Sequence, residues 1–360
     1  MIILLKFNNL IINNKQRKKT MKNKLLLSSA LVGSLVASSI SFAETKITGS
    51  MDLSYTARSS DTAKSSDNGF GRETQINISN SGELSNGLGY SAGFSLEMDG
   101  GGTAKNNENI NLDIKAGDVT FTVGVDHVSN MDSSAVPRVS APANSIAVSS
   151  KDLSYNQGAS FFTAGNTDQT HAKEAMGVGA SMGGFVVYYV PRLEDVGGGN
   201  DAYAGGNGGS AYQIMYKGNA GVEGLNINAG MQGSEKAANS TYTSQRDVDN
   251  TQISASYNFG QFTVGAGKID SENGASSAAS DRETVDYGVT YAVNDQLSIG
   301  INYAETELTG QANDEEVTMV QVGYNLGAVG VVLSYLDIQN VENAASTDDQ
   351  IASIRIATKF

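Results

Sequence analysis

The chain has 360 residues, of which 39% are hydrophobic and 17% are charged, and its formal net charge is −14. It contains no cysteine and only two histidines, which excludes a disulfide framework and a histidine-rich metal site. The acidic balance also argues against a nucleic-acid partner, because proteins that bind nucleic acids carry basic patches.

The N-terminal segment has the organisation of an export leader. Residues 1–24 carry seven Lys or Arg and no acid, residues 25–40 form an apolar, serine-rich run, and Ser41-Phe42-Ala43 offers a small-x-small cleavage site. We interpret residues 1–43 as a secretory signal peptide cut before Glu44. Residues 1–20 either come from a start codon assigned too far upstream or belong to a long leader. A membrane anchor is the alternative, but the run is shorter than the roughly 20 residues that a span needs.

Cleavage would make the remaining chain strongly acidic. Loss of the leader removes seven of the 24 basic residues and none of the 38 acidic residues. Residues 44–360 therefore carry 17 Lys and Arg and a net charge of −21. We expect these residues to form one domain.

Sixteen segments after the leader alternate apolar with polar side chains, and no convincing helical period is present. Each is about as long as a tilted membrane strand of roughly 9 to 11 residues. The segments lie near 45–57, 72–81, 87–98, 108–116, 118–126, 174–182, 184–192, 210–217, 223–232, 249–259, 261–270, 281–292, 296–307, 315–326, 328–338 and 349–360.

The two faces of these segments differ in a way that favours a membrane barrel. Within 249–259, for example, Ile253, Ala255 and Tyr257 alternate with serine and asparagine. A soluble sandwich would fill its inner faces with large side chains and place charge outside. The polar faces here are mostly Gly, Ser, Thr and Asn, which suit a watery lumen. The pattern predicts an all-β, transmembrane, antiparallel up-and-down β-barrel of sixteen strands.

The connections alternate between short and long, which is typical of outer-membrane barrels. Glycine-containing turns near 117, 183, 260 and 327 alternate with polar stretches such as 58–71, 193–209 and 233–248. An even number of strands returns the last one to the first, so that no edge stays unpaired. The longest unpatterned stretch, 127–173, contains short apolar runs at 153–155 and 161–164, which leave an extra hairpin and eighteen strands open.

Three segments carry motifs of one known family. Residues 75–97, residues 118–126 and Met182-Gly-Gly-Phe185 resemble, in this order, the second hairpin, the strand before the constriction loop and the hairpin after that loop in the Gram-negative general porins. With the leader and the terminal Phe360, the resemblance covers the whole chain.

The resemblance implies a homotrimer of sixteen-stranded barrels in the outer membrane, in contact with lipid and lipopolysaccharide. In each barrel the long third extracellular loop, about 127–173, would fold into the pore. The resemblance also implies that the barrel-assembly machinery reads a C-terminal signal formed by Ile354, Ile356 and Phe360.

The chain departs from the family at the wall that faces this loop. Many members have arginines in the slots occupied here by Gln75, Ser79 and Thr122, and Val125 fills a further slot that is often basic. With the acidic balance, this predicts a preference for cations. The candidate pore-lining residues are Lys46, Asp52, Gln75, Glu97, Asp113, Lys115, Asp126, Asp132, Arg138, Lys151, Asp152, Asp286, Arg355 and Lys359.

The sequence therefore predicts a passive diffusion porin for small hydrophilic solutes and ions. No catalytic or metal motif is complete, so we expect no enzyme activity and no cofactor. Two alternatives stay open: a substrate-specific channel, which Tyr188, Tyr189 and Tyr203 would allow, and a secreted all-β surface protein or adhesin. The adhesin would lack the aromatic bands that lie near the strand ends here.

Overall fold

The computed structural model describes residues 41–60, 69–99, 106–125, 135–141, 146–147, 176–191, 210–235, 248–273, 281–343 and 345–360. Within these ranges no helix is both long enough and apolar enough to cross a membrane.

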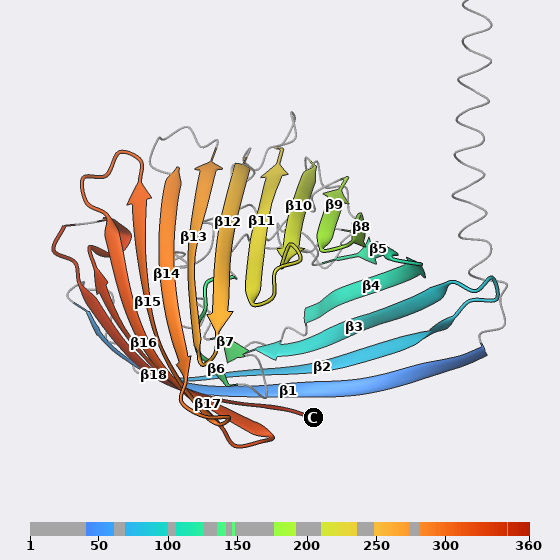
Figure 1. Ribbon diagram of the computed structural model, residues 1–360, viewed down its shortest axis with the longest axis horizontal. Coiled ribbons are helices and arrows are strands. Elements are labelled where there is room, and N and C mark those ends of the chain that lie inside the picture. Colours follow the sequence, from blue (N-terminus) through green and yellow to red (C-terminus); the bar gives the residue numbers. More distant parts are fainter. Residues whose placement is uncertain are drawn as a thin grey trace, which may run out of the picture.

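Sixteen antiparallel strands pair side by side and close into a barrel in the described part of the chain (Figure 1). Each of the sixteen alternating segments forms one strand of the wall, so that prediction is confirmed. The strands are β1 (Ser41–Ser60), β2 (Gly69–Glu83), β3 (Gly89–Asp99), β4 (Asn106–Ala116), β5 (Val119–Gly124), β8 (Gly177–Met182), β9 (Phe185–Val190), β10 (Ala211–Gly218), β11 (Leu225–Ser234), β12 (Val248–Phe259), β13 (Phe262–Asn273), β14 (Arg282–Ala292), β15 (Leu297–Leu308), β16 (Glu315–Asn325), β17 (Val329–Gln339) and β18 (Asp349–Lys359).

Three short elements lie outside the wall. Strands β6 (Ser140–Ala141) and β7 (Ile146–Ala147) form a separate two-stranded sheet, and η1 (Val341–Asn343) is a single turn of 3-10 helix. The wall therefore has sixteen strands rather than the eighteen that the extra hairpin would give. The two apolar runs that suggested this hairpin, 153–155 and 161–164, lie outside the described residues.

The barrel closes where the first strand meets the last. Strands β1 and β18 pair from Ser50 with Lys359 to Ser60 with Asp349. Beyond this ladder, the Phe360 N–H donates to the Gly49 carbonyl at 2.9 Å and the Gly49 N–H donates to the Phe360 carbonyl at 2.7 Å. The C-terminus is thus held by backbone bonds, and the seam leaves the paired part of the barrel without a free edge.

The short turns have the backbone that their glycines predict. Gly117 between β4 and β5 has a φ of 62°, and Gly327 between β16 and β17 has a φ of 85°. This left-handed region is accessible to glycine at little cost and strained for most other residues. The four glycine-containing turns near 117, 183, 260 and 327 lie at the same rim, and the long connections leave from the other rim.

The outer face of the wall is apolar, as predicted. At the middle of β15, Ile301 is 50% exposed and lies in register with Val289 on β14 and Val320 on β16. Its neighbour Asn302 points the other way and is 1% exposed. Because successive side chains of a strand point to opposite faces, this alternation puts apolar groups outside and polar groups inside.

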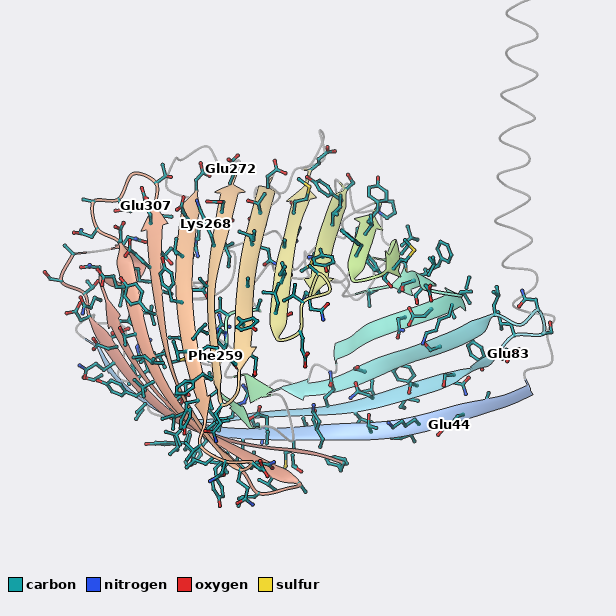
Figure 2. The ribbon with its side chains drawn as sticks, in the orientation of Figure 1. Glu44, Glu83, Phe259, Lys268, Glu272 and Glu307 are labelled. Atoms are coloured by element: carbon teal, nitrogen blue, oxygen red, sulfur yellow. The ribbon has the colours of Figure 1, made fainter. Side chains whose placement is uncertain are left out.

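Aromatic side chains gather on the outer face near the short-turn rim. At the short-turn rim the rings of Phe259 and Phe262 lie 5.8 Å apart, and Phe262 and Tyr291 lie 4.6 Å apart. Figure 2 shows Phe259 at one end of the wall and Glu272 and Glu307 at the other. An aromatic band next to an apolar one is the pattern of a membrane interface.

Candidate functional site

One part of the channel interior is a polar wall built by β1 to β5. Thr122 lies between two outward-facing and exposed residues of β5, so its hydroxyl points into the barrel. That hydroxyl donates to Asp113 Oδ1 at 2.7 Å. Oδ2 of Asp113 accepts from Ser91 Oγ at 3.0 Å and from Asn111 Nδ2 at 2.9 Å. Three neutral donors therefore hold this carboxylate on the inner face.

The slots that prompted the selectivity prediction lie on this same wall. Gln75 and Ser79 alternate with isoleucines along β2, and Ser79 is exposed to the interior. The Gln75 amide oxygen accepts from Asn77 Nδ2 at 3.2 Å. Val125, directly after β5, is buried. The predicted lumen residues Lys46, Lys115 and Lys359 also share the inner face, and all three are exposed near the short-turn rim.

Two ion pairs lie across the seam between β1 and β18. The predicted candidates Asp52 and Arg355 meet as a salt bridge on the inner face. A second pair, Arg58 with Asp349, lies nearer the long-loop rim and is almost completely buried. The sequence did not single out this second pair, although opposite charges at diagonal positions of the first and last strands were a usable signal.

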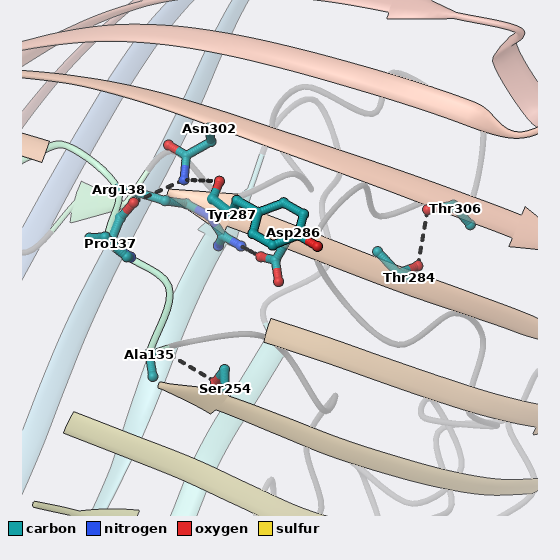
Figure 3. Close-up of polar contacts among 9 residues, drawn as sticks. All are labelled: Ala135, Pro137, Arg138, Ser254, Thr284, Asp286, Tyr287, Asn302 and Thr306. Atoms are coloured by element: carbon teal, nitrogen blue, oxygen red, sulfur yellow. Dashed lines mark hydrogen bonds and ion pairs between the residues drawn. The ribbon is translucent and has the colours of Figure 1, made fainter. Parts of the chain in front are cut away.

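The described part of the long third loop crosses the inner face of the opposite wall. The Ala135 N–H donates to Ser254 Oγ on β12 at 3.3 Å (Figure 3). Further along, Asn302 Nδ2 on β15 donates to the Pro137 carbonyl at 2.9 Å.

The crossing continues over the next strands. The Val139 N–H donates to Gln321 Oε1 on β16 at 3.1 Å, and β6 contacts β16 and β17. Residues 135–141 thus run across consecutive strands inside the barrel, as the resemblance implied.

Two predicted pore-lining charges are brought together beneath this segment. Arg138 Nη2 on the loop lies 3.4 Å from Asp286 Oδ2 on β14 (Figure 3). The Asp286 side chain is 1% exposed and that of Arg138 is 13% exposed. The two side chains therefore contact each other and the wall, and little of either is exposed to water.

Buried apolar side chains fill part of the interior between the loop and the wall. Val136 and Val139 of the loop are buried against the wall. A cluster of buried apolar side chains on the inner face of β15 to β18 continues this region towards η1, and it consists of Ala304, Val317, Met319, Val332, Leu336, Ile338, Val341 and Ile351. Asn343 covers it by donating to the carbonyls of Thr306 at 2.8 Å and Asn313 at 2.9 Å. Water-filled space is therefore expected on the side of β1 to β5.

Several candidates lie beyond what the structure describes. The side chain of Glu97 on β3 is one, and Asp126, Asp132, Lys151, Asp152 and Tyr203 are the others. Among the described residues, no group of three or more histidine, aspartate and glutamate side chains is arranged to hold a metal ion.

The comparisons with known proteins agree with this geometry. A family model for Gram-negative porins matches residues 28–346. None of the curated proteins matches the chain in sequence. Among solved structures, one engineered variant of the porin of Rhodopseudomonas blastica superposes with a TM-score of 0.58 at 16% identity, and a second with a TM-score of 0.59 at 15% identity. Each alignment covers 88% of this chain and 100% of the other. The chain belongs to the Gram-negative porin family and is an outer-membrane porin.

Proposed function

We propose that this porin is a passive diffusion channel for small hydrophilic solutes and ions, with its water path between the third loop and the wall of β1 to β5. The observation that carries the proposal is the division of the interior. Polar side chains, several of them exposed, line β1 to β5, whereas the loop and buried apolar groups occupy the inner face of β13 to β18. Solutes would cross down their gradients, and no energy source is required.

We also propose that the channel prefers cations. Asp113 supports this, because its described hydrogen-bond partners are the neutral groups of Ser91, Asn111 and Thr122. A carboxylate held by neutral donors keeps its charge available to passing ions, and a carboxylate beside the water path favours cations. By contrast, Asp52 is matched by Arg355 across the seam.

Reconstitution in planar bilayers tests both statements. The protein should insert with stepwise conductance, and a salt gradient should give a reversal potential of cation-preferring sign. Asp113→Asn should move that potential towards zero. Glu272→Gln is the matched control, because Glu272 is exposed on the outer face of β13 and should move the potential much less than Asp113→Asn does. Absence of conductance steps would refute the channel, and an anion-preferring potential would refute the selectivity.

Cysteine labelling locates the water path, because the chain has no cysteine of its own. Ser79→Cys on β2 should react with a charged thiol reagent and reduce the current, since position 79 is exposed inside the barrel. Ser334→Cys is the control: it also faces inward, but Ser334 is 5% exposed and accepts a hydrogen bond from Gln321 at 3.2 Å. Equal reactivity at both positions would contradict the division of the interior.

The remaining proposals concern export and assembly. We propose cleavage of a signal peptide before Glu44, assembly as a homotrimer in contact with lipopolysaccharide, and recognition of Ile354, Ile356 and Phe360 by the assembly machinery. N-terminal sequencing of the outer-membrane protein, together with its mass in mild detergent, tests the first two. A protein that begins upstream of Glu44 or runs as a monomer would contradict them.

A substrate-specific channel is the remaining alternative. It would need exposed aromatic side chains along the path, and Tyr188, which faces inward, is only 4% exposed. Its ring instead fills the space above Gly179, where an added Cβ would lie 2.5 Å from Cδ2 of the ring. Conductance that saturates with one solute would favour this alternative, and a linear dependence on concentration would favour passive diffusion.

A further inference from the structure

Three glycines lie directly beneath the crossing segment of the third loop, one on each of three consecutive strands. A Cβ added to Gly265 on β13 would be 2.6 Å from Cδ of Pro137. One added to Gly288 on β14 would be 2.5 Å from the Pro137 carbonyl oxygen, and one added to Gly300 on β15 would be 2.8 Å from Cγ2 of Val139. Ordinary contacts are 3.4 to 4 Å, so an added Cβ would displace the loop at all three positions, and at Gly265 it would also lie 2.7 Å from the Ala255 carbonyl oxygen of the neighbouring strand β12.

The register places these glycines as a continuous track. Gly265 and Gly288 are directly paired across β13 and β14, and Gly300 pairs with Thr290, two residues further along β14. The loop follows the track from β13 to β15. Glycine permits such close approach of two backbones because it has no side chain. The track thus sets how far the loop stands from the wall.

Side chains around the track fix the loop in place. Asn302 donates to the Pro137 carbonyl, and Gln321 accepts from the Val139 N–H while donating to Ser334. Both amides are almost completely buried, at 1% and 0% exposure. Buried backbone groups need such partners, so each bond holds the loop at one height and one register. The ion pair of Arg138 with Asp286 adds a further attachment.

We propose that Gly265, Gly288 and Gly300 determine the size selectivity of the channel without touching the solute, and that Asp286 is a positioning residue. The track sets the height of the loop above the wall and hence the gap left on the opposite side. The buried pair of Arg138 and Asp286 holds the loop and contributes little to charge selection. This inference rests on the proposed channel function.

Adding one methyl group beneath the loop tests the track. In Gly288→Ala the new Cβ lies 2.5 Å from the Pro137 carbonyl oxygen and 2.5 Å from Asn302 Nδ2, which donates to that carbonyl. Both the loop and the amide that holds it must therefore move, by about the difference between 2.5 Å and an ordinary contact, on the order of 1 Å. The movement is away from the wall and into the lumen. We expect a lower single-channel conductance and a larger loss of flux for a trisaccharide than for a monosaccharide in liposome swelling.

A matched control and a second variant make this test decisive. Gly69→Ala on β2 has nothing within 4 Å of the new Cβ and should conduct like the parent. In Gly300→Ala the loop atom that the new Cβ meets is Cγ2 of Val139 at 2.8 Å, and the other near atoms, Thr290 Cγ2 at 3.0 Å and the Val289 carbonyl oxygen at 3.2 Å, belong to the wall. Because the end of a side chain can turn aside, this variant should give a smaller decrease than Gly288→Ala. If Gly288→Ala does not fold, as judged by heat-modifiable gel migration, Gly300→Ala carries the test. Parent conductance in a folded track variant would overturn the inference.

Substitution of the ion pair separates positioning from charge selection. We expect Asp286→Asn to raise current noise and change the conductance, while the reversal potential in a salt gradient stays at the parent value. Asp113→Asn, in contrast, should shift that potential. A shift for Asp286→Asn equal to that for Asp113→Asn would place Asp286 on the ion path and overturn its positioning role. A parent protein without channels would instead refute the proposed function itself.

Discussion

The strongest test of the architecture is to place one charge on each face of the wall. Ile301 on β15 is half exposed on the outer face, and its neighbours in register are Val289 and Val320. In a bilayer this position lies in hydrocarbon. Ile301→Arg should therefore cost about 2–4 kcal/mol of folding free energy, the penalty for arginine near the midplane of a barrel. That penalty corresponds to about 30-fold to several-hundred-fold in the folding equilibrium.

The control places the same charge in water. Ser79 is exposed on the inner face of β2, so Ser79→Arg should change the free energy by less than about 1 kcal/mol. Urea titrations in phosphatidylcholine vesicles measure both variants. The folded fraction is read from gel migration without boiling, because the chain has no tryptophan. Equal stability of the two variants, or a larger loss for Ser79→Arg, would refute the assignment of the faces.

Three further substitutions test individual contacts, each read as a shift in the same urea titration. Gly49→Ala should destabilise the seam by about 1–3 kcal/mol, because the new Cβ would lie 2.5 Å from the Phe360 ring. Arg58→Gln should cost about 3–5 kcal/mol by leaving Asp349 buried without its arginine, and adding Asp349→Asn should recover part of this loss. Asn343→Ala should cost about 1–3 kcal/mol, since two carbonyls lose their donor.

The strands of the wall could be predicted from the sequence because the alternation that marks each strand is local. Lipid outside and water inside impose a two-residue period on every strand, and the period is readable without knowing any partner. The strand ends were less accurate. Strand β1 begins at Ser41 rather than near residue 45, because it continues to pair with β2 after its pairing with β18 has stopped.

The interior could be predicted only in part, since its contacts join residues far apart in the chain. The Gly, Ser, Thr and Asn residues of the polar faces were interpreted as suiting a watery lumen, but Gly265 makes space for Pro137. No local pattern indicates that a loop 128 residues earlier occupies this space. The pairing of Arg138 with Asp286, 148 residues apart, is equally invisible to periodicity. Such contacts follow from the closure of the barrel, which brings distant strands beneath one loop.

The net charge of the chain can be counted from the sequence, but the charge that lines the channel depends on where the fold places each residue. Many acids lie on the outer face near the long-loop rim, where Lys268 Nζ is 2.9 Å from Glu283 Oε2 and 3.3 Å from Asp270 Oδ1. Inside, Asp52 and Asp286 each face an arginine. The net charge is therefore a poor measure of the field that an ion meets in the pore.

Ionic strength distinguishes the two sources of selectivity. Screening shortens the reach of charge from about 10 Å at 0.1 M to about 3 Å at 1 M salt. Acids on the outer face should then lose their influence on the pore, whereas Asp113, whose carboxylate lies on the inner wall, stays within reach of passing ions. We expect cation preference to decrease between these concentrations but to persist at 1 M, and the persistent part to disappear in Asp113→Asn. Complete loss of selectivity at 1 M in the parent would assign the preference to the outer acids instead.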